Sequence, residues 1–207
     1  MEDLLNYYLT LPFLEIIAVL SSLLYVILAA KTNVWCWPAA LVSTAIYTFL
    51  FYKFYLWMDS FLQIYYMGMA FYGWYCWNKD TEAFDEKKVK LKAYKLKTHV
   101  IMITGLSVTS FVVGILMDKY TPTDFPYLDS TTTVFAVFAT YLVAQKVVEN
   151  WLYWIVIDAV SIYLYVEKDL MPTAFLFTVF IVIAVYGYYK WRQEYKGYND
   201  LNASLIS

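Results

Sequence analysis

Residues 72–77 read YGWYCW, and residues 186–191 read YGYYKW. The two stretches lie 114 positions apart, and at that offset residues 14–77 align without a gap to residues 128–191. The alignment contains 16 identities in 64 positions, among them Trp37 with Trp151 and Trp77 with Trp191. Identities of leucine, valine and alanine arise often by chance in an apolar chain. The tryptophan, tyrosine and glycine identities therefore carry most weight. The sequence therefore predicts two similar halves, a pattern that is typical of transporters when the chain is apolar.

The composition predicts an integral membrane protein. Hydrophobic residues make up 62% of the 207-residue chain and charged residues only 15%, against roughly 45–50% and about 25% in soluble domains. The chain begins with acidic residues and has no basic region before its first apolar run, so no cleavable signal peptide is expected. Two cysteines and one histidine cannot build a typical closed zinc site. We therefore expect no metal, no cofactor and no nucleic-acid partner.

Seven apolar stretches are long enough to be read as spanning helices. They are residues 13–31, 34–55, 59–77, 99–117, 130–146, 150–166 and 171–190. The expected fold is all-α, with seven transmembrane helices in a 3+1+3 arrangement of parallel repeats. Residues 1–77 form the first repeat and residues 128–191 the second. Residues 78–127 supply a lysine-rich loop, a linker helix and an external loop, and residues 192–207 form a tail.

Basic residues predict the orientation of the chain, because they concentrate on the cytoplasmic side. The 78–98 loop alone carries seven lysines. If this loop is cytoplasmic, alternation of seven spans places twelve of the fifteen basic residues inside. The N-terminus is then outside and the C-terminus is in the cytoplasm.

Asp158 is the only ionisable residue near the middle of any predicted span. A carboxylate at that depth costs at least about 2.5–3.5 kcal/mol on insertion scales, so it is a functional candidate by default. Asn150, Trp154 and Asp158 follow one another at helical spacing and share a face, with Trp151 beside it. The corresponding candidates in the second and third predicted helices are Ser43, Tyr47, Gln63, Tyr66, Trp74 and Trp77.

These residues predict a slot with aromatic walls, a few amide groups and one negative charge. Such a slot favours a small, flat and positively charged ligand, since cation–π contacts add about 2 kcal/mol or more when desolvated. Aromatic residues also gather at membrane interfaces. On that ground Trp35, Trp57 and Trp191 are predicted to be interfacial residues. For Trp77, Trp151 and Trp154 the sequence does not decide between an interfacial and a ligand-binding role. Gly73 and Gly187 are predicted to permit close helix packing.

Four stretches resemble the PnuC family of bacterial vitamin transporters, whose best-known member takes up nicotinamide riboside. They are LEIIAVLSSLLY (14–25), the segment 62–77 ending in YGWYCW, PTDFPYLDS (122–130) and KVVENWLYWIVIDAVSIYLY (146–165). The resemblance implies a 3+1+3 fold similar in outline to SWEET sugar transporters, in the bacterial inner membrane. It further implies a homotrimer and facilitated diffusion, with the substrate trapped by a separate cytoplasmic kinase.

Carried onto this sequence, the family's WxxW motif falls on Trp74 and Trp77, its glutamine on Gln63, and its NWxxW motif on Asn150, Trp151 and Trp154. The chain departs from the nicotinamide riboside members at Ser43 and Asp158, where those members carry asparagine. The expected substrate is nicotinamide riboside, with thiamine as an alternative, since both are cationic. Riboflavin is less favoured, because it is neutral.

Two other classes of protein fit the sequence poorly. A retinal-type photoreceptor needs a lysine midway along its last helix, but the only lysine of the last span, Lys190, lies at its end. An intramembrane enzyme needs a nucleophile with a base or a metal cluster, and the predicted spans contain neither. We therefore expect a transporter and not an enzyme.

Overall fold

The structure, a computed structural model, describes residues 2–53, 57–83, 90–167 and 169–206. In these residues it contains seven α-helices, as predicted, and their contacts divide the chain into two compact units, Met1–Val89 and Lys90–Ser207. Part of the predicted lysine-rich loop, residues 84–89, lies outside the described residues. Each unit is described by itself.

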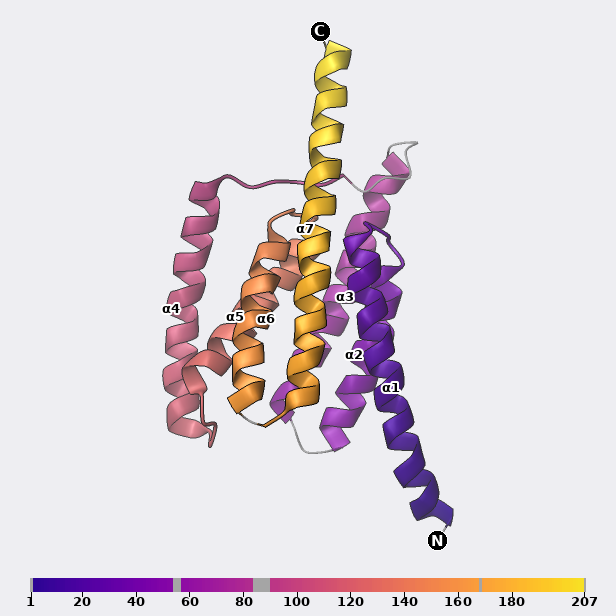
Figure 1. Ribbon diagram of the computed structural model, residues 1–207, viewed down its shortest axis with the longest axis vertical. Helices are drawn as coiled ribbons and strands as arrows, with labels where there is room; N and C mark the ends of the chain where they lie inside the picture. Colours follow the sequence, from indigo (N-terminus) through magenta and orange to yellow (C-terminus); the bar gives the residue numbers. More distant parts are fainter. Residues whose placement is uncertain (1, 54–56, 84–89, 168, 207) are drawn as a thin grey trace. The chain divides into compact units, whose positions relative to one another are not determined.

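The first unit holds three helices, which Figure 1 colours from indigo to magenta. They are α1 (Glu2–Ala30), α2 (Cys36–Lys53) and α3 (Trp57–Ala83). Helix α2 packs against both α1 and α3. The Ser43 hydroxyl in α2 donates a hydrogen bond of 3.0 Å to the Ala18 carbonyl in α1.

The second unit holds α4 (Leu96–Tyr120), α5 (Pro126–Ala144), α6 (Asn150–Glu167) and α7 (Met171–Ile206). Helix α6 packs against α5 and α7, and α4 packs against α5 (Figure 1). Small residues bring α4 and α5 together, because Gly114 leaves room for the Tyr127 ring and Ser130 donates a 2.9 Å hydrogen bond to the Ser110 carbonyl. Helix α7 continues well past the other helices of this unit.

Three helices combine the length and hydropathy of a membrane span within the described residues. The apolar windows are Phe13–Ala30, Leu96–Tyr120 and Thr173–Asp200. The other four helices also carry hydroxyl, amide and indole groups, among them Ser43, Gln63, Thr140 and Asn150. Polar groups of this kind occur in spanning helices where they face protein instead of lipid.

The turns after α1 and α5 repeat the same hydrogen bonds at the predicted offset of 114. Thr32 and Lys146 both adopt a left-handed conformation, with φ of 54° and 62°. The amide of Asn33 donates to the Leu28 carbonyl at 3.0 Å, and that of Val147 donates to Leu142 at the same distance. This is the Schellman arrangement, which satisfies carbonyl groups at a helix end. The same turn therefore occurs at matching positions of the two stretches that align in the sequence.

A tryptophan seated on a glycine also occurs once in each repeat. Trp37 lies against Gly73 and meets Trp77 edge-on, with ring centroids 5.5 Å apart and planes at 89°. Trp151 lies against Gly187 and meets Trp191 with the same separation and an angle of 88°. We call each arrangement a tryptophan seat. The predicted packing role of the two glycines is confirmed, since a Cβ atom on either would collide with the indole.

Candidate functional site

Asp158 lies halfway along α6 and is only 3% exposed. Within the part of the chain that the structure describes, no hydrogen bond or ion pair joins its carboxylate. Trp154 and Asn150 precede it by one and two helical turns on the same face. A buried carboxylate without a protein partner is expensive, and a cationic ligand would offset that cost.

Asn150 is the first residue of α6 and is completely buried. Its side-chain amide donates a hydrogen bond of 2.6 Å to the Val147 carbonyl. Its Oδ1 atom is buried and has no hydrogen-bond partner among the described residues, and the same holds for the indole Nε1 of Trp151. One acceptor and one donor at the start of α6 therefore have no partner among the described residues, although such buried groups usually have one.

The two tryptophans of the NWxxW motif occupy different surroundings. Trp151 is buried in its tryptophan seat, between Gly187 and Trp191. Trp154 is only half-buried and packs beside a core cluster that includes Tyr153 and Ile157. Trp154 is consequently the member of the pair that has free ring surface for stacking on a ligand.

The two tryptophans of the WxxW motif in α3 also differ in burial. Trp77 is completely buried against Trp37. Trp74 is half-buried and meets the exposed Trp35 edge-on at a centroid distance of 5.7 Å. Trp74 therefore has free ring surface in the first unit, as Trp154 does in the second.

The remaining candidates lie in α2 and α3. Ser43 is buried, and its hydroxyl proton is engaged by α1. Tyr47 is half-buried and stacks on Phe51 at 5.5 Å. Gln63 and Tyr66 are half-buried residues of α3, and the Tyr66 ring meets that of Tyr65. Six candidates thus belong to the first unit, and the four on α6 belong to the second.

The predicted interfacial role is wrong for Trp191, which is 0% exposed because its ring packs into the second tryptophan seat. Trp35 is 66% exposed, as an interfacial residue requires, and the side chain of Trp57 lies outside the described residues. The position of Trp191 near a span end could not show which way the ring points. Its alignment with Trp77 at the repeat offset was the signal that could have placed it inside.

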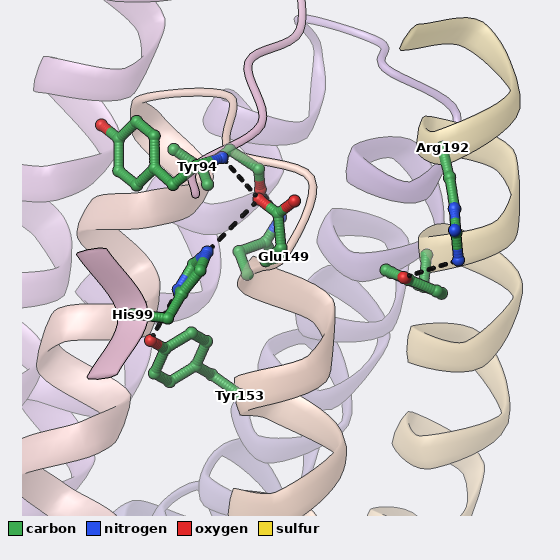
Figure 2. A network of polar contacts seen from close by, with 8 residues as sticks. Tyr94, His99, Glu149, Tyr153 and Arg192 are labelled. Atoms are coloured by element: carbon green, nitrogen blue, oxygen red, sulfur yellow. Dashed lines mark hydrogen bonds and ion pairs between the residues drawn. The ribbon is translucent and has the colours of Figure 1, made fainter. Parts of the chain in front are cut away.

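Sequence reasoning also missed a polar network beside Asn150, formed by Tyr94, His99, Glu149 and Tyr153 (Figure 2). The only signal for it was that Glu149 directly precedes the NWxxW motif. Among the residues that the structure describes, no three metal-ligating side chains lie close enough together to hold a metal ion.

Comparison with known proteins gives consistent results. The model of the nicotinamide mononucleotide transporter family matches residues 12–193. The nicotinamide riboside transporter PnuC of Haemophilus influenzae is 26% identical, over 90% of this chain and 82% of that protein. PnuC of Escherichia coli K12 is 23% identical, over 87% of this chain and 85% of that protein.

A relative with a different substrate is similarly close. The riboflavin/roseoflavin transporter RibM of Streptomyces davaonensis is 25% identical, over 82% of this chain and 80% of that protein. Among solved structures, the crystal structure of the vitamin B3 transporter PnuC superposes with a TM-score of 0.73 at 22% identity. The match covers 94% of this chain and 86% of that one, so the two proteins share a fold.

Proposed function

Since the chain belongs to the nicotinamide mononucleotide transporter family, we propose that it imports a small cationic vitamin precursor, and that this precursor is nicotinamide riboside. Family membership makes the protein a multi-pass membrane transporter and not an enzyme. The relatives from H. influenzae and E. coli that are named as nicotinamide riboside transporters support this choice of substrate.

The observation that carries the proposal is the buried carboxylate of Asp158, which has no hydrogen bond or ion pair within the described part of the chain and lies one turn from the half-buried Trp154. The pyridinium ring of nicotinamide riboside is flat and positively charged, so it satisfies both groups at once. The carboxylate neutralises the charge, and the indole provides a π face for the ring. Asn150 and Gln63 have amide groups that suit the ribose hydroxyls and the ring carboxamide.

Thiamine is the second candidate, because its thiazolium ring is also a flat cation. Riboflavin has the support of the RibM relative. Its isoalloxazine ring is neutral, however, and would leave the buried Asp158 without a counter-charge. Asp158 therefore favours the two cationic vitamins.

Three further features of the proposal follow from the resemblance to the PnuC family. Transport is facilitated diffusion, and a separate cytoplasmic kinase traps the substrate by phosphorylation. The protein works as a homotrimer in the bacterial inner membrane. Within the second unit, the candidate groups for contact with the substrate are the ring of Trp154 and the polar groups of Asn150 and Asp158.

The test is isothermal titration of the purified protein with nicotinamide riboside, thiamine and riboflavin. Saturable binding of the riboside alone supports the proposal, and binding of thiamine alone reassigns the substrate. Binding of riboflavin alone, or of none of the three, contradicts the proposal.

Asp158→Asn tests the role of the carboxylate in the same titration. The variant should bind the cationic vitamin about ten- to a hundredfold more weakly, as expected when a charged hydrogen bond is lost. Asp169→Asn is the matched control, since Asp169 is exposed and its φ of 56° suits asparagine. Equal affinities of Asp158→Asn and wild type would make Asp158 a structural residue.

A further inference from the structure

Glu149 joins three parts of the second unit through one carboxylate oxygen (Figure 2). Its Oε2 atom accepts a hydrogen bond of 3.2 Å from the backbone amide of Tyr94. The same atom lies 3.7 Å from Nε2 of His99, in the first turn of α4. His99 Nδ1 in turn lies 2.9 Å from the Tyr153 hydroxyl on α6. We call these four residues the α6 anchor.

A backbone contact lies next to the anchor, two residues before Tyr94 in the sequence. The amide of Lys92 donates to the Lys146 carbonyl at 2.9 Å, and the amide of Val148 donates to the Lys92 carbonyl at 2.8 Å. The segment before α4 is thereby fixed to the turn between α5 and α6. The backbone bonds hold this turn, whereas the anchor reaches α6 itself through the Tyr153 hydroxyl in its first turn.

The side chains of the anchor are partly buried, and electrostatic contacts are stronger away from water. The side chains of His99 and Glu149 are only 10% and 22% exposed. Burial raises the pKa of the Tyr94 hydroxyl, with Tyr141 and the Glu149 charge adding to the effect. His99 Nε2 is buried and has no hydrogen-bond acceptor among the described residues, so the Glu149 carboxylate at 3.7 Å is the charge it faces.

Two anchor residues, Glu149 just before α6 and Tyr153 within it, directly precede candidate substrate residues. Glu149 precedes Asn150, and Tyr153 precedes Trp154. Successive residues in a helix are rotated by about 100°, so the two pairs form neighbouring columns on one rigid cylinder. A rotation of α6 that displaces the anchored column displaces the column of Asn150, Trp154 and Asp158 by the same angle.

We propose that Glu149 and His99 are positioning residues for substrate binding, because the contact between their side chains fixes the rotation of α6 about its axis. The inference rests on the proposed function only for the identity of the ligand. Neither residue touches the substrate, and both act through Asn150 and Trp154.

The first test compares Glu149→Gln, His99→Asn and the double variant in the full-length protein. Glutamine keeps an acceptor for the Tyr94 amide but removes the charge that faces His99. Asparagine keeps a polar group toward Tyr153 but removes Nε2. Each single variant should raise the Kd for nicotinamide riboside about three- to tenfold. The Kd of the double variant should be no higher than that of the single variant with the larger increase, because the two residues act as a pair.

Glu167→Gln is the matched control, because Glu167 is exposed at the other end of α6. It should leave the Kd unchanged. Lower thermal stability with an unchanged Kd in Glu149→Gln and His99→Asn would make the anchor purely structural and overturn the inference. Additive losses in the double variant would show that the two residues do not act as a pair, and would overturn it as well.

Hydrogen exchange of the backbone amides of residues 150–158, measured without ligand, separates this inference from the proposed function. Faster exchange in both single variants, with no further increase in the double variant, supports the anchor even if wild type binds none of the three vitamins. Exchange as slow as in wild type in both single variants overturns the anchor, even if wild type binds the riboside tightly.

Discussion

At the scale of single residues, six of the eight tryptophans fall into two groups that the side-chain type does not distinguish. Trp37, Trp77, Trp151 and Trp191 close the two tryptophan seats and are almost fully buried. Trp74 and Trp154 come from the same motifs but keep part of their rings exposed. Burial thus assigns the first group to packing and leaves the second for ligand contact.

Trp154→Ala should lower the affinity for the vitamin by about 1–2 kcal/mol, because the variant loses a stacking and cation–π partner. Isothermal titration with nicotinamide riboside measures the change. Phe175→Ala is the control, since this aromatic residue of α7 is highly exposed and should not affect the Kd. A Trp154→Ala protein that purifies in lower yield but keeps its Kd would place Trp154 among the packing residues.

The sequence predicted the residue types of the candidate site better than their surroundings. Asp158 was found because a charge within an apolar stretch is conspicuous, and the structure places it in the interior. The hydrogen bond from Ser43 to Ala18 and the burial of Trp191 were not predicted. Both depend on which neighbouring helix faces the residue, and a linear pattern does not contain that information.

At the scale of elements, the tryptophan seat fixes how closely the two helices of a pair approach. A Cβ atom on Gly187 would lie 2.7–2.8 Å from three ring atoms of Trp151, which is closer than real side chains come. The indole cannot retreat easily, because Trp191 meets it edge-on. Gly73 therefore sets the spacing of α2 and α3, and Gly187 sets that of α6 and α7.

Gly187→Ala should destabilise the protein by about 1–3 kcal/mol, the usual cost of overpacking. Gly197→Ala, in the same helix, is the control, since nothing lies within 4 Å of its added methyl group. That control should be neutral or slightly stabilising, because alanine favours a helix more than glycine does. Thermal unfolding in detergent compares the two variants, and equal midpoints would contradict the packing role of Gly187.

The number of helices could be predicted from the sequence, but several of their ends could not. Helix α3 continues to Ala83 and α7 to Ile206, past the predicted ends at residues 77 and 190. Hydropathy detects the part of a helix that suits a membrane, whereas polar residues can prolong the helix beyond it. The contact of Lys92 with the α5–α6 turn follows no periodic pattern, so nothing in the sequence indicated it.

At the scale of the whole molecule, the distribution of basic residues predicts how the chain is inserted. Twelve of the fifteen lysines and arginines fall on one side if all seven helices cross the membrane. A count of six or eight spans would break this agreement. The C-terminus should therefore lie in the cytoplasm and the N-terminus outside.

Fusion of reporter proteins to the two ends tests this orientation. A green fluorescent protein after Ser207 should fluoresce, because it folds in the cytoplasm. Alkaline phosphatase at the same position should be inactive, because it requires export. An active phosphatase combined with a dark fluorescent protein at the C-terminus would reverse the predicted orientation.

The tryptophan seats bear on how a transporter of this kind can evolve. Each repeat holds its own helices together through a buried indole and a glycine. The first pair is far along the chain from Asp158, and Trp151 of the second lies about two helical turns before Asp158 on α6. Among the described residues, Asp158 makes no hydrogen bond or ion pair whose loss would loosen the bundle. A codon for aspartate becomes one for asparagine by a single nucleotide change. One genetic step thus changes the charge of the candidate site, while the scaffold that carries it stays intact.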